Sequence, residues 1–237
     1  MEPYQAYTQQ IRQGPEDEET AAFFDLDGTI IATHSVKDVF SERLFSGQVG
    51  LAEAFDLVNM AGRYALKIGN FEDAMSSSLN NMRGLEVKGF KALCEKVFRE
   101  RLAPVIFPEM KAIIRSHRAQ GHTMAIITSA TRFQAEPLAQ SLGIDHVLCT
   151  ELGESKGRFT GAIDGEACYG PAKVRAATQF AEKHGLDLTR SFFYSNGIED
   201  LPLLESVGHP VAINPDRKLL TEAKWNDWPV HQLDSRG

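Results

Sequence analysis

Hydrophobic and polar residues follow two patterns along the chain, and the points where the pattern changes divide the sequence into parts. Residues 1–19 are mostly polar and end in an acidic run, so we expect a mobile tail there. Residues 20–24 form a short apolar run that stops at Asp25, which is typical of a buried parallel strand. Between residues 35 and 102 the apolar positions recur at helical spacing instead.

Each segment of residues 35–102 has one predicted apolar face. The four faces consist of Val36, Val39, Phe40 and Leu44; Leu51, Phe55, Val58 and Gly62; Phe71, Met75 and Leu79; and Phe90, Leu93, Val97 and Phe98. Glycines separate the segments. Because the pattern of a strand does not occur here, we predict a small helical insert.

Strands and helices alternate after residue 102. A helix is predicted to begin at Pro108 and end at Gly121. The other predicted helices are 133–142 and 174–184, and the predicted strands are 124–127, 146–149, 192–194 and 210–213. The glycine-rich stretch 153–170 predicts a hairpin with arms at 158–160 and 162–163.

Strands interleaved with helices imply an α/β fold with a doubly wound parallel sheet. Sheets of this kind carry their chemistry at the carboxyl ends of the strands. We therefore expect a core of residues 20–34 and 103–237, into which the helical segment 35–102 is inserted.

The overall composition narrows the classes of function. Hydrophobic content of 43% and charged content of 24% are ordinary for a globular chain of 237 residues. A net charge of −7 argues against nucleic acid and anionic membranes as partners, because both require a basic surface. Cys94, Cys149 and Cys168 have no metal-ligand spacing, which indicates reduced thiols. Since neither a membrane span nor the layout of a signal peptide is evident, we expect a cytoplasmic protein.

Asp25 and Asp27 provide the first candidate chemistry, at the end of the first predicted strand. Two carboxylates directly after an apolar run are costly unless a positive charge compensates them. Oxygen ligands of this type suit Mg²⁺, which usually takes one or two carboxylates together with water and substrate phosphate. An acidic turn with Thr29 at the start of a helix is the alternative interpretation.

Residues 24–29, Phe-Asp-Leu-Asp-Gly-Thr, resemble the first signature of the haloacid dehalogenase superfamily of aspartyl phosphatases. Three further signatures follow in order, so the resemblance covers nearly the whole chain beyond residue 19. It implies a Rossmann-like core with an inserted helical cap. It also implies that Asp25 is the nucleophile and a metal ligand. Asp27 would be the general acid and then the general base, and would bind the metal through its backbone carbonyl.

The second and third signatures supply groups that bind phosphate. Ser129 resembles the hydroxyl donor of the second signature, and Thr128 is the adjacent alternative. Lys173, at the start of a predicted helix, resembles the lysine of the third, which would hold phosphate and balance the carboxylates. Lys156, in the predicted hairpin, is the alternative lysine.

The fourth signature, residues 194–200, departs from the pattern of the superfamily. Relatives usually have an aspartate as a direct metal ligand where this chain has Asn196. An amide can bind metal through its oxygen, but it removes one negative charge. Asp200 keeps the other acidic position as a predicted ligand, and Glu199 adds a carboxylate beside it. A natural variant compensated by Glu199 or Asp200 is the favoured explanation, and an engineered inactivation or a weakened enzyme are the others.

The helical insert and residues 208–216 resemble subfamily IB of the superfamily, the branch related to phosphoserine phosphatase. In phosphoserine phosphatases a glutamate shortly after the nucleophile meets the ammonium group of the substrate. By direct count that position here is His34, which suits an additional anion better. Arg132, beside the second signature, is a further predicted substrate contact. Similar domains are also fused to glycerolipid acyltransferases, which makes a phospholipid precursor a second substrate class to test.

The expected function is therefore a magnesium-dependent phosphatase that acts through an aspartyl phosphate on a small alcohol phosphomonoester. A catalytically silent relative that binds phosphate or a partner is one alternative, motivated by Asn196. A phosphotransferase that passes the phosphoryl group to an alcohol is another. A response-regulator-like receiver is less favoured, because it requires neither residues 27–29 nor a helical insert. The sequence does not predict the oligomeric state.

Overall fold

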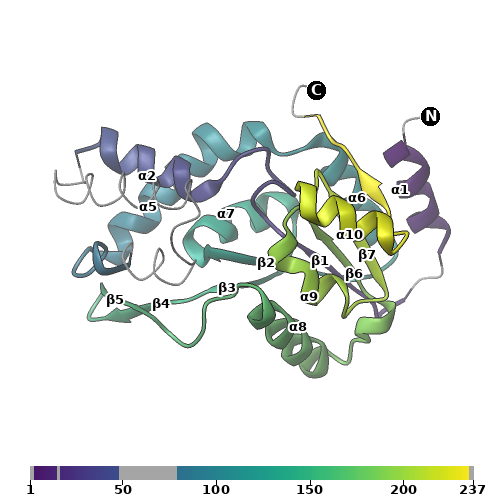
Figure 1. Ribbon diagram of the computed structural model, residues 1–237. Helices are drawn as coiled ribbons and strands as arrows, with labels where there is room; N and C mark the ends of the chain where they lie inside the picture. The colour runs from purple at the N-terminus through teal and green to yellow at the C-terminus, as the bar shows by residue number, and fades with distance from the viewer. Residues whose placement is uncertain (1–2, 15–16, 48–78, 235–237) are drawn as a thin grey trace.

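A six-stranded parallel sheet forms the centre of the computed structural model, which describes residues 3–14, 17–47 and 79–234 (Figure 1). The strand order is β3-β2-β1-β6-β7-β8, and each pair of neighbours is parallel. The bounds are β1 Ala21–Phe24, β2 Thr123–Thr131, β3 His146–Thr150, β6 Phe192–Ser195, β7 His209–Ile213 and β8 Val230–His231. Two further strands, β4 Leu152–Ser155 and β5 Arg158–Ile163, form a separate antiparallel hairpin.

Helices pack on both faces of the sheet. Their bounds are α1 Pro3–Gln13, α2 Ser35–Phe45, α5 Val87–Val97, α6 Pro108–Ala119, α7 Arg132–Leu142, α8 Pro171–His184, α9 Leu201–Leu204 and α10 Arg217–Trp225, with short turns η1 Phe98–Leu102, η2 Ala103–Val105, η3 Leu188–Arg190 and η4 Ile198–Asp200. Ala22 and Phe24 of β1 belong to the apolar cluster that includes α6 and α7. Ala21 and Phe23 point the other way, into the cluster of α8, α9 and α10. The predicted doubly wound α/β fold is confirmed.

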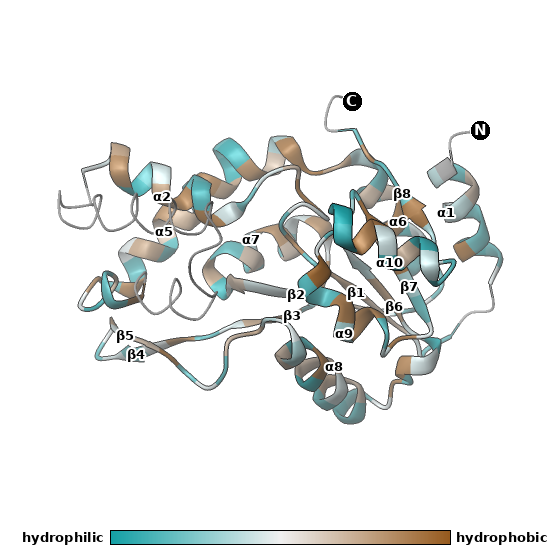
Figure 2. Ribbon diagram, viewed as in Figure 1, coloured by the Kyte–Doolittle hydropathy of each residue, from teal (hydrophilic) through white to brown (hydrophobic). Residues whose placement is uncertain are grey.

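Hydropathy differs between the central strands and the helices that cover them. Figure 2 shows hydrophilic and hydrophobic residues mixed along α8 and α10, as expected of helices with one face on a sheet. Every residue of β1 is buried. Of the helices in the described ranges, none is both long enough and apolar enough to cross a lipid bilayer.

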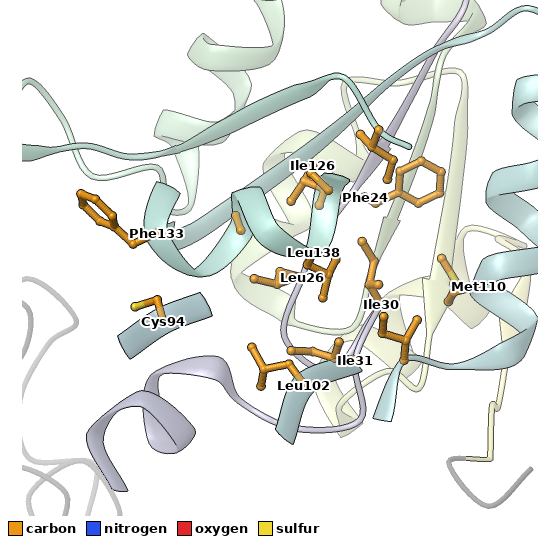
Figure 3. Packing of buried hydrophobic residues seen from close by; sticks show 14 of the residues in the cluster. Phe24, Leu26, Ile30, Ile31, Cys94, Leu102, Met110, Ile126, Phe133 and Leu138 are labelled. Atoms are coloured by element: carbon orange, nitrogen blue, oxygen red, sulfur yellow. The ribbon is translucent and has the colours of Figure 1, made fainter. Parts of the chain in front are cut away.

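Apolar side chains anchor the loop that follows β1. Leu26, Ile30 and Ile31 are fully buried and belong to the same cluster as Leu102 and Leu138 (Figure 3). The carbonyl oxygen of Leu26 accepts hydrogen bonds from the amides of Ile30 and Ile31, at 3.0 and 3.2 Å. This anchoring fixes the loop backbone, and the polar residues that alternate with the apolar ones are thereby held at the edge of the sheet.

Residues 3–13 differ from the predicted mobile tail, because they form helix α1. Tyr7 and Ile11 lie one helical turn apart on its inner face. Ile11 is buried in the main cluster, and the hydroxyl of Tyr7 lies 2.9 Å from that of Tyr194 in a hydrogen bond. The mainly polar composition hides this narrow apolar face, so the prediction of a mobile tail is wrong for α1.

In the part that the structure describes, the segment predicted as a helical insert contains α2, α5 and η1, with turns at residues 81–84 and an isolated bridge from Glu86 to Arg158. The second predicted apolar face and most of the third lie in residues 48–78, outside the described residues. The division into a core of 20–34 and 103–237 and an insert of 35–102 therefore stays a prediction.

The apolar face predicted for α2 is only partly buried. Val39 is buried and Phe40 is half-buried, but Val36 is 58% exposed and Leu44 is 43% exposed, whereas Glu42 is buried. The carboxylate of Glu42 forms ion pairs with Lys96 and Arg101, at 2.6 and 2.9 Å. Charged side chains thus occupy part of the buried face of α2, beside Ser35 and Val39.

The predicted hairpin is present, but its arms are β4 and β5. Its turn lies at Lys156 and Gly157, which have φ angles of 51° and 74°, as a two-residue hairpin turn requires. Gly161, the predicted turn, lies inside β5. Two later elements, α10 and β8, were not predicted. The side chain of Asp216 accepts hydrogen bonds from two amides at the start of α10.

Replacing Ile11 with alanine tests whether α1 is part of the folded core. We expect Ile11→Ala to lower the free energy of unfolding by about 2 kcal/mol, because it removes a buried aliphatic side chain. Gln9→Ala, on an exposed position of the same helix, is the control and should change stability by less than about 0.5 kcal/mol. Urea denaturation measures both, and equal stability of the two variants would show that residues 3–13 are a tail.

Candidate active site

The carboxyl ends of three neighbouring strands supply the polar residues of the candidate site. Asp25 directly follows β1, Ser129 lies near the end of β2, and Asn196 directly follows β6. Because β2, β1 and β6 are adjacent in the sheet, their carboxyl ends bring these residues to one edge. Lys173 reaches the same edge from the first turn of α8.

Lys173 lies between two carboxylates. Its Nζ donates to Asp25 Oδ1 and to Asp200 Oδ2, both at 2.8 Å. The exposed fraction of each of the three side chains is 11% or less. Ser195 Oγ donates to the same oxygen of Asp200 at 2.6 Å, which fixes the carboxylate against the lysine. Segments far apart in sequence are thus joined by one buried cation.

The electrostatic environment favours a protonated lysine. Burial opposes the charge of Lys173, but the attraction of Asp200 and Asp25 is stronger and raises the pKa of the ammonium. Burial raises the pKa of Asp25, Lys173 opposes that rise, and the negative charge of Asp200 reinforces it. A carboxylate that is this deeply buried gains from any further cation placed beside it.

Asp27 has neutral hydrogen-bond partners. The backbone amide of Ser35 donates to Asp27 Oδ1 at 2.7 Å, and the hydroxyl of Ser35 donates to Oδ2 at 3.1 Å. Burial raises the pKa of Asp27, while these hydrogen bonds and the nearby imidazole of His34 oppose the rise. Burial thus raises the pKa of both acidic residues of this loop, but Asp25 has a cationic hydrogen-bond partner and Asp27 has neutral ones.

Gly28 lies against the residue that departs from the superfamily pattern. Its φ angle of 79° belongs to the left-handed region, which glycine adopts most readily. A Cβ atom at this position would lie only 2.2 Å from Asn196 Nδ2. The amide of Asn196 therefore packs in space that exists because residue 28 has no side chain.

Several oxygen atoms at this edge suit a divalent metal ion. Asp200 Oδ1 is buried without a hydrogen-bond partner. Asp25 Oδ2 and Asn196 Oδ1 lie 3.4 and 3.5 Å from Thr29 Oγ1, so both point toward the same region. Asp25 and Asp200 also outnumber Lys173 by one charge when both are ionised, which leaves a negative charge for a cation to balance.

The predicted ligand set fits Mg²⁺ in its chemistry, since all its donors are oxygen atoms. The described residues contain no group of three or more His, Cys, Asp or Glu side chains that could hold a metal ion. An amide, Asn196, and the backbone carbonyl of Asp27 complete the predicted set of Asp25 and Asp200. Asparagine at the predicted ligand position 196 gives this set one negative charge fewer than an aspartate would.

The other predicted site residues lie in varied surroundings. Thr128 is buried and its hydroxyl accepts a hydrogen bond from the amide of Ala130 at 3.1 Å, while Ser129 is half-buried. His34 is exposed at the N-terminus of α2. Arg132 forms ion pairs with Glu151 and Glu154, at 2.8 and 3.5 Å. Lys156, the alternative lysine, is exposed in the hairpin turn.

Residues 22–205 match the family described as haloacid dehalogenase-like hydrolase. The chain belongs to this family. It is 34% identical to the inhibition of morphological differentiation protein of Streptomyces azureus, over 89% of this chain and 77% of that protein. It is 30% identical to a phosphoserine phosphatase of Mycobacterium tuberculosis, over 94% and 73% of the two chains. It is also 30% identical to a histidinol-phosphatase of Neisseria meningitidis, over 88% and 96%. These matches confirm the predicted enzyme class, a phosphatase.

Solved structures share the fold of this haloacid dehalogenase-like hydrolase. A protein of unknown function from Bordetella pertussis Tohama I superimposes with a TM-score of 0.81 at 29% identity, covering 92% of this chain and all of the other. A substrate-bound phosphoserine phosphatase superimposes with a TM-score of 0.69 at 16% identity, covering 93% and 97%. The second likeness shows a common fold.

The structure adds site residues that the sequence did not single out. Ser195 binds Asp200, Ser35 binds Asp27, and Gln134 Nε2 donates to Ser35 Oγ at 3.0 Å. A local signal existed for Gln134, because Thr131 and Gln134 have the spacing of a capping box at the start of a helix. The contact between Gln134 and Ser35 joins positions 99 residues apart, which a local pattern does not predict.

Replacing Lys173 with methionine tests the buried ion cluster of this haloacid dehalogenase-like hydrolase. Loss of the ammonium leaves Asp25 and Asp200 facing each other without it, so we expect Lys173→Met to lower the free energy of unfolding by about 3–5 kcal/mol in metal-free buffer. Lys156→Met is the matched control and should change it by less than about 0.5 kcal/mol. Urea denaturation of both variants measures the difference. A loss of similar size in the two variants would contradict the assignment of Lys173 to this cluster.

Proposed function

We propose that this chain is a magnesium-dependent phosphatase that hydrolyses a small alcohol phosphomonoester through a phosphoryl group carried on Asp25. The observation that carries the proposal is the position of Asp25. Its carboxylate is buried at the carboxyl end of the central strand β1, next to the ammonium of Lys173. A carboxylate held in this way is oriented for attack on a phosphorus atom bound beside the same cation.

Lys173 and the start of α8 bind the phosphoryl group of the substrate. A helix N-terminus and an ammonium both attract a phosphate dianion. The hydroxyl of Ser129, or that of Thr128, donates a hydrogen bond to another phosphoryl oxygen. These contacts orient the phosphorus atom toward Asp25 and stabilise the charge that spreads over its oxygens during transfer.

Asp27 performs the two proton transfers. In the first displacement the bond from an Asp25 oxygen to phosphorus forms, the bond to the leaving alcohol breaks, and Asp27 gives its proton to the leaving oxygen. In the second, Asp27 takes a proton from the water that releases phosphate from Asp25. When bound by Asp25, Asn196, Asp200 and the carbonyl of Asp27, Mg²⁺ would supply positive charge against the transferring group.

The substrate is proposed from the relatives and from the residues at the site. Histidinol phosphate and phosphoserine, the substrates in the names of two relatives, are both phosphates of a primary alcohol with an amino group on the next carbon. By direct count, His34 takes the place of the glutamate that meets the ammonium group in phosphoserine phosphatases, so recognition of an amino group at that point is less favoured for both compounds. A screen of histidinol phosphate, O-phosphoserine, phosphoethanolamine and glycerol 3-phosphate with Mg²⁺, read by release of inorganic phosphate, identifies the substrate. Release from none of them would oppose the proposal.

Asparagine at position 196 supports one alternative, a relative that binds phosphate without turnover. A phosphotransferase differs in the fate of the phosphoryl group. Turnover with added alcohols distinguishes it, because transfer then yields a new phosphomonoester in place of inorganic phosphate.

Replacing Asp25 with asparagine tests the nucleophile. An amide cannot attack phosphorus, so we expect Asp25→Asn to abolish phosphate release while the protein remains folded in a thermal melt. Asp227→Asn, at an exposed position, is the control and should retain parental activity. A folded Asp25→Asn protein with activity close to that of the parent would remove this mechanism.

Replacing Asn196 with aspartate tests how the site tolerates asparagine. We expect the parent to be active at millimolar Mg²⁺ and Asn196→Asp to change the half-saturating Mg²⁺ concentration by less than about threefold, because the carboxylates of Asp25 and Asp200 already supply charge. Asp200→Asn should raise that concentration by about tenfold or more, with Glu199→Gln as its neighbouring control.

Magnesium titrations of phosphate release, each accompanied by a thermal melt, compare these variants. An inactive parent that gains activity and tight magnesium binding with Asn196→Asp would favour the silent relative. A larger effect of Glu199→Gln than of Asp200→Asn would transfer the compensating role to Glu199.

A further inference from the structure

One residue binds both carboxylate oxygens of Asp27. Ser35 donates its backbone amide to Oδ1 and its hydroxyl to Oδ2, at 2.7 and 3.1 Å. Two donors fixed in one residue set the plane of the carboxyl group, which a single donor leaves free to rotate. Each oxygen keeps a second lone pair, so Asp27 can still interact with a substrate.

Ser35 is itself fixed by a third residue. Its side chain is fully buried at the first position of α2, and its hydroxyl accepts a hydrogen bond from Gln134 Nε2 at 3.0 Å. A serine hydroxyl has one proton. Since Gln134 occupies its acceptor side, that proton is directed to Asp27.

The amide of Gln134 has one orientation in this arrangement. Its oxygen accepts hydrogen bonds from the backbone amide and the hydroxyl of Thr131, at 3.0 and 2.9 Å. The NH₂ group is therefore the part that faces Ser35. Gln134 lies in the first turn of α7, directly after β2, and is buried. A continuous set of hydrogen bonds thus connects the end of β2, where Ser129 lies, to Asp27.

We propose that Ser35 and Gln134 are positioning residues that hold the carboxyl group of Asp27 where it passes a proton to the leaving oxygen of the substrate. This inference rests on the proposed phosphatase function. Without Ser35 Oγ, one Asp27 oxygen loses its donor and the carboxyl group can turn. Without Gln134, the Ser35 hydroxyl can turn its proton elsewhere. Either change slows proton delivery and leaves Asp25 and Lys173 in place.

Two substrates that differ in their need for a proton test this role. An alkyl phosphate releases an alkoxide, which must be protonated as it leaves, whereas 4-nitrophenyl phosphate releases a phenolate that leaves well without a proton. We compare kcat/KM, which reports the first displacement, for 4-nitrophenyl phosphate and for the alkyl phosphate that the parent hydrolyses fastest. The ratio of the two values does not depend on how much of a variant is folded.

We expect Ser35→Ala and Gln134→Met each to lower kcat/KM for the alkyl phosphate by about 10–100-fold, and for 4-nitrophenyl phosphate by less than about threefold. The double variant should fall within about threefold of Ser35→Ala, because the two residues act in series. Ser116→Ala, on α6, and Gln120→Met, directly after it, are matched controls, because both residues are also buried and hydrogen-bonded, and their ratios should equal that of the parent.

Equal losses on both esters, or no loss on either, would overturn the positioning role. If one variant fails to fold, the ratio in the other decides. A parent that hydrolyses neither ester would overturn the proposed function and this inference with it, whereas an active parent with equal losses would overturn this inference alone.

Discussion

The attraction between Lys173 and its two carboxylate partners is the interaction on which the arrangement of the site depends. Adjacent strands of a parallel sheet bring their carboxyl ends together. The acidic residues that follow β1 and β6 are therefore placed close to one another even though their negative charges repel. A buried ammonium at 2.8 Å from each makes that arrangement stable. The lysine arrives from α8, so the register of that helix on the sheet is coupled to the charge balance of the site.

Asp25 and Asp27 show how one loop supplies two environments, which suit the two roles that we propose for them. Burial raises the pKa of Asp25, but the cation beside it opposes that rise and favours the ionised form that the proposed nucleophile requires. Asp27 is bound by neutral donors of Ser35 and buried beside them, an environment that tolerates gain and loss of a proton. The buried side chains of Leu26, Ile30 and Ile31 hold the backbone between these environments (Figure 3). The apolar half of the motif is therefore as necessary as the acidic half.

Local patterns in the sequence predicted much of the fold, and they selected the residues that the structure brings together in the candidate site. The apolar runs of β1 and β6 are recognisable as strands from the sequence. The order of the four motifs that resemble the superfamily signatures selects Asp25 and Lys173. Contacts between distant segments have no such local pattern. Tyr7 meets Tyr194 across 187 positions, and Glu42 meets Lys96 across 54, so the docked α1 and the inward charge of α2 could not be predicted. The same reason hid the contact between Gln134 and Ser35.

The close packing of Gly28 against Asn196 constrains how this site can change over evolutionary time. A Cβ atom on residue 28 would lie 2.2 Å from the asparagine amide, so a larger residue at 28 is excluded while the present side chain stays where it is. A side chain at 196 that shortens or turns away would remove this contact, but the φ angle of 79° would still strain any L-residue at 28. Position 28 is therefore restricted twice, by its own backbone and by its neighbour, whereas position 196 can change as long as residue 28 remains glycine.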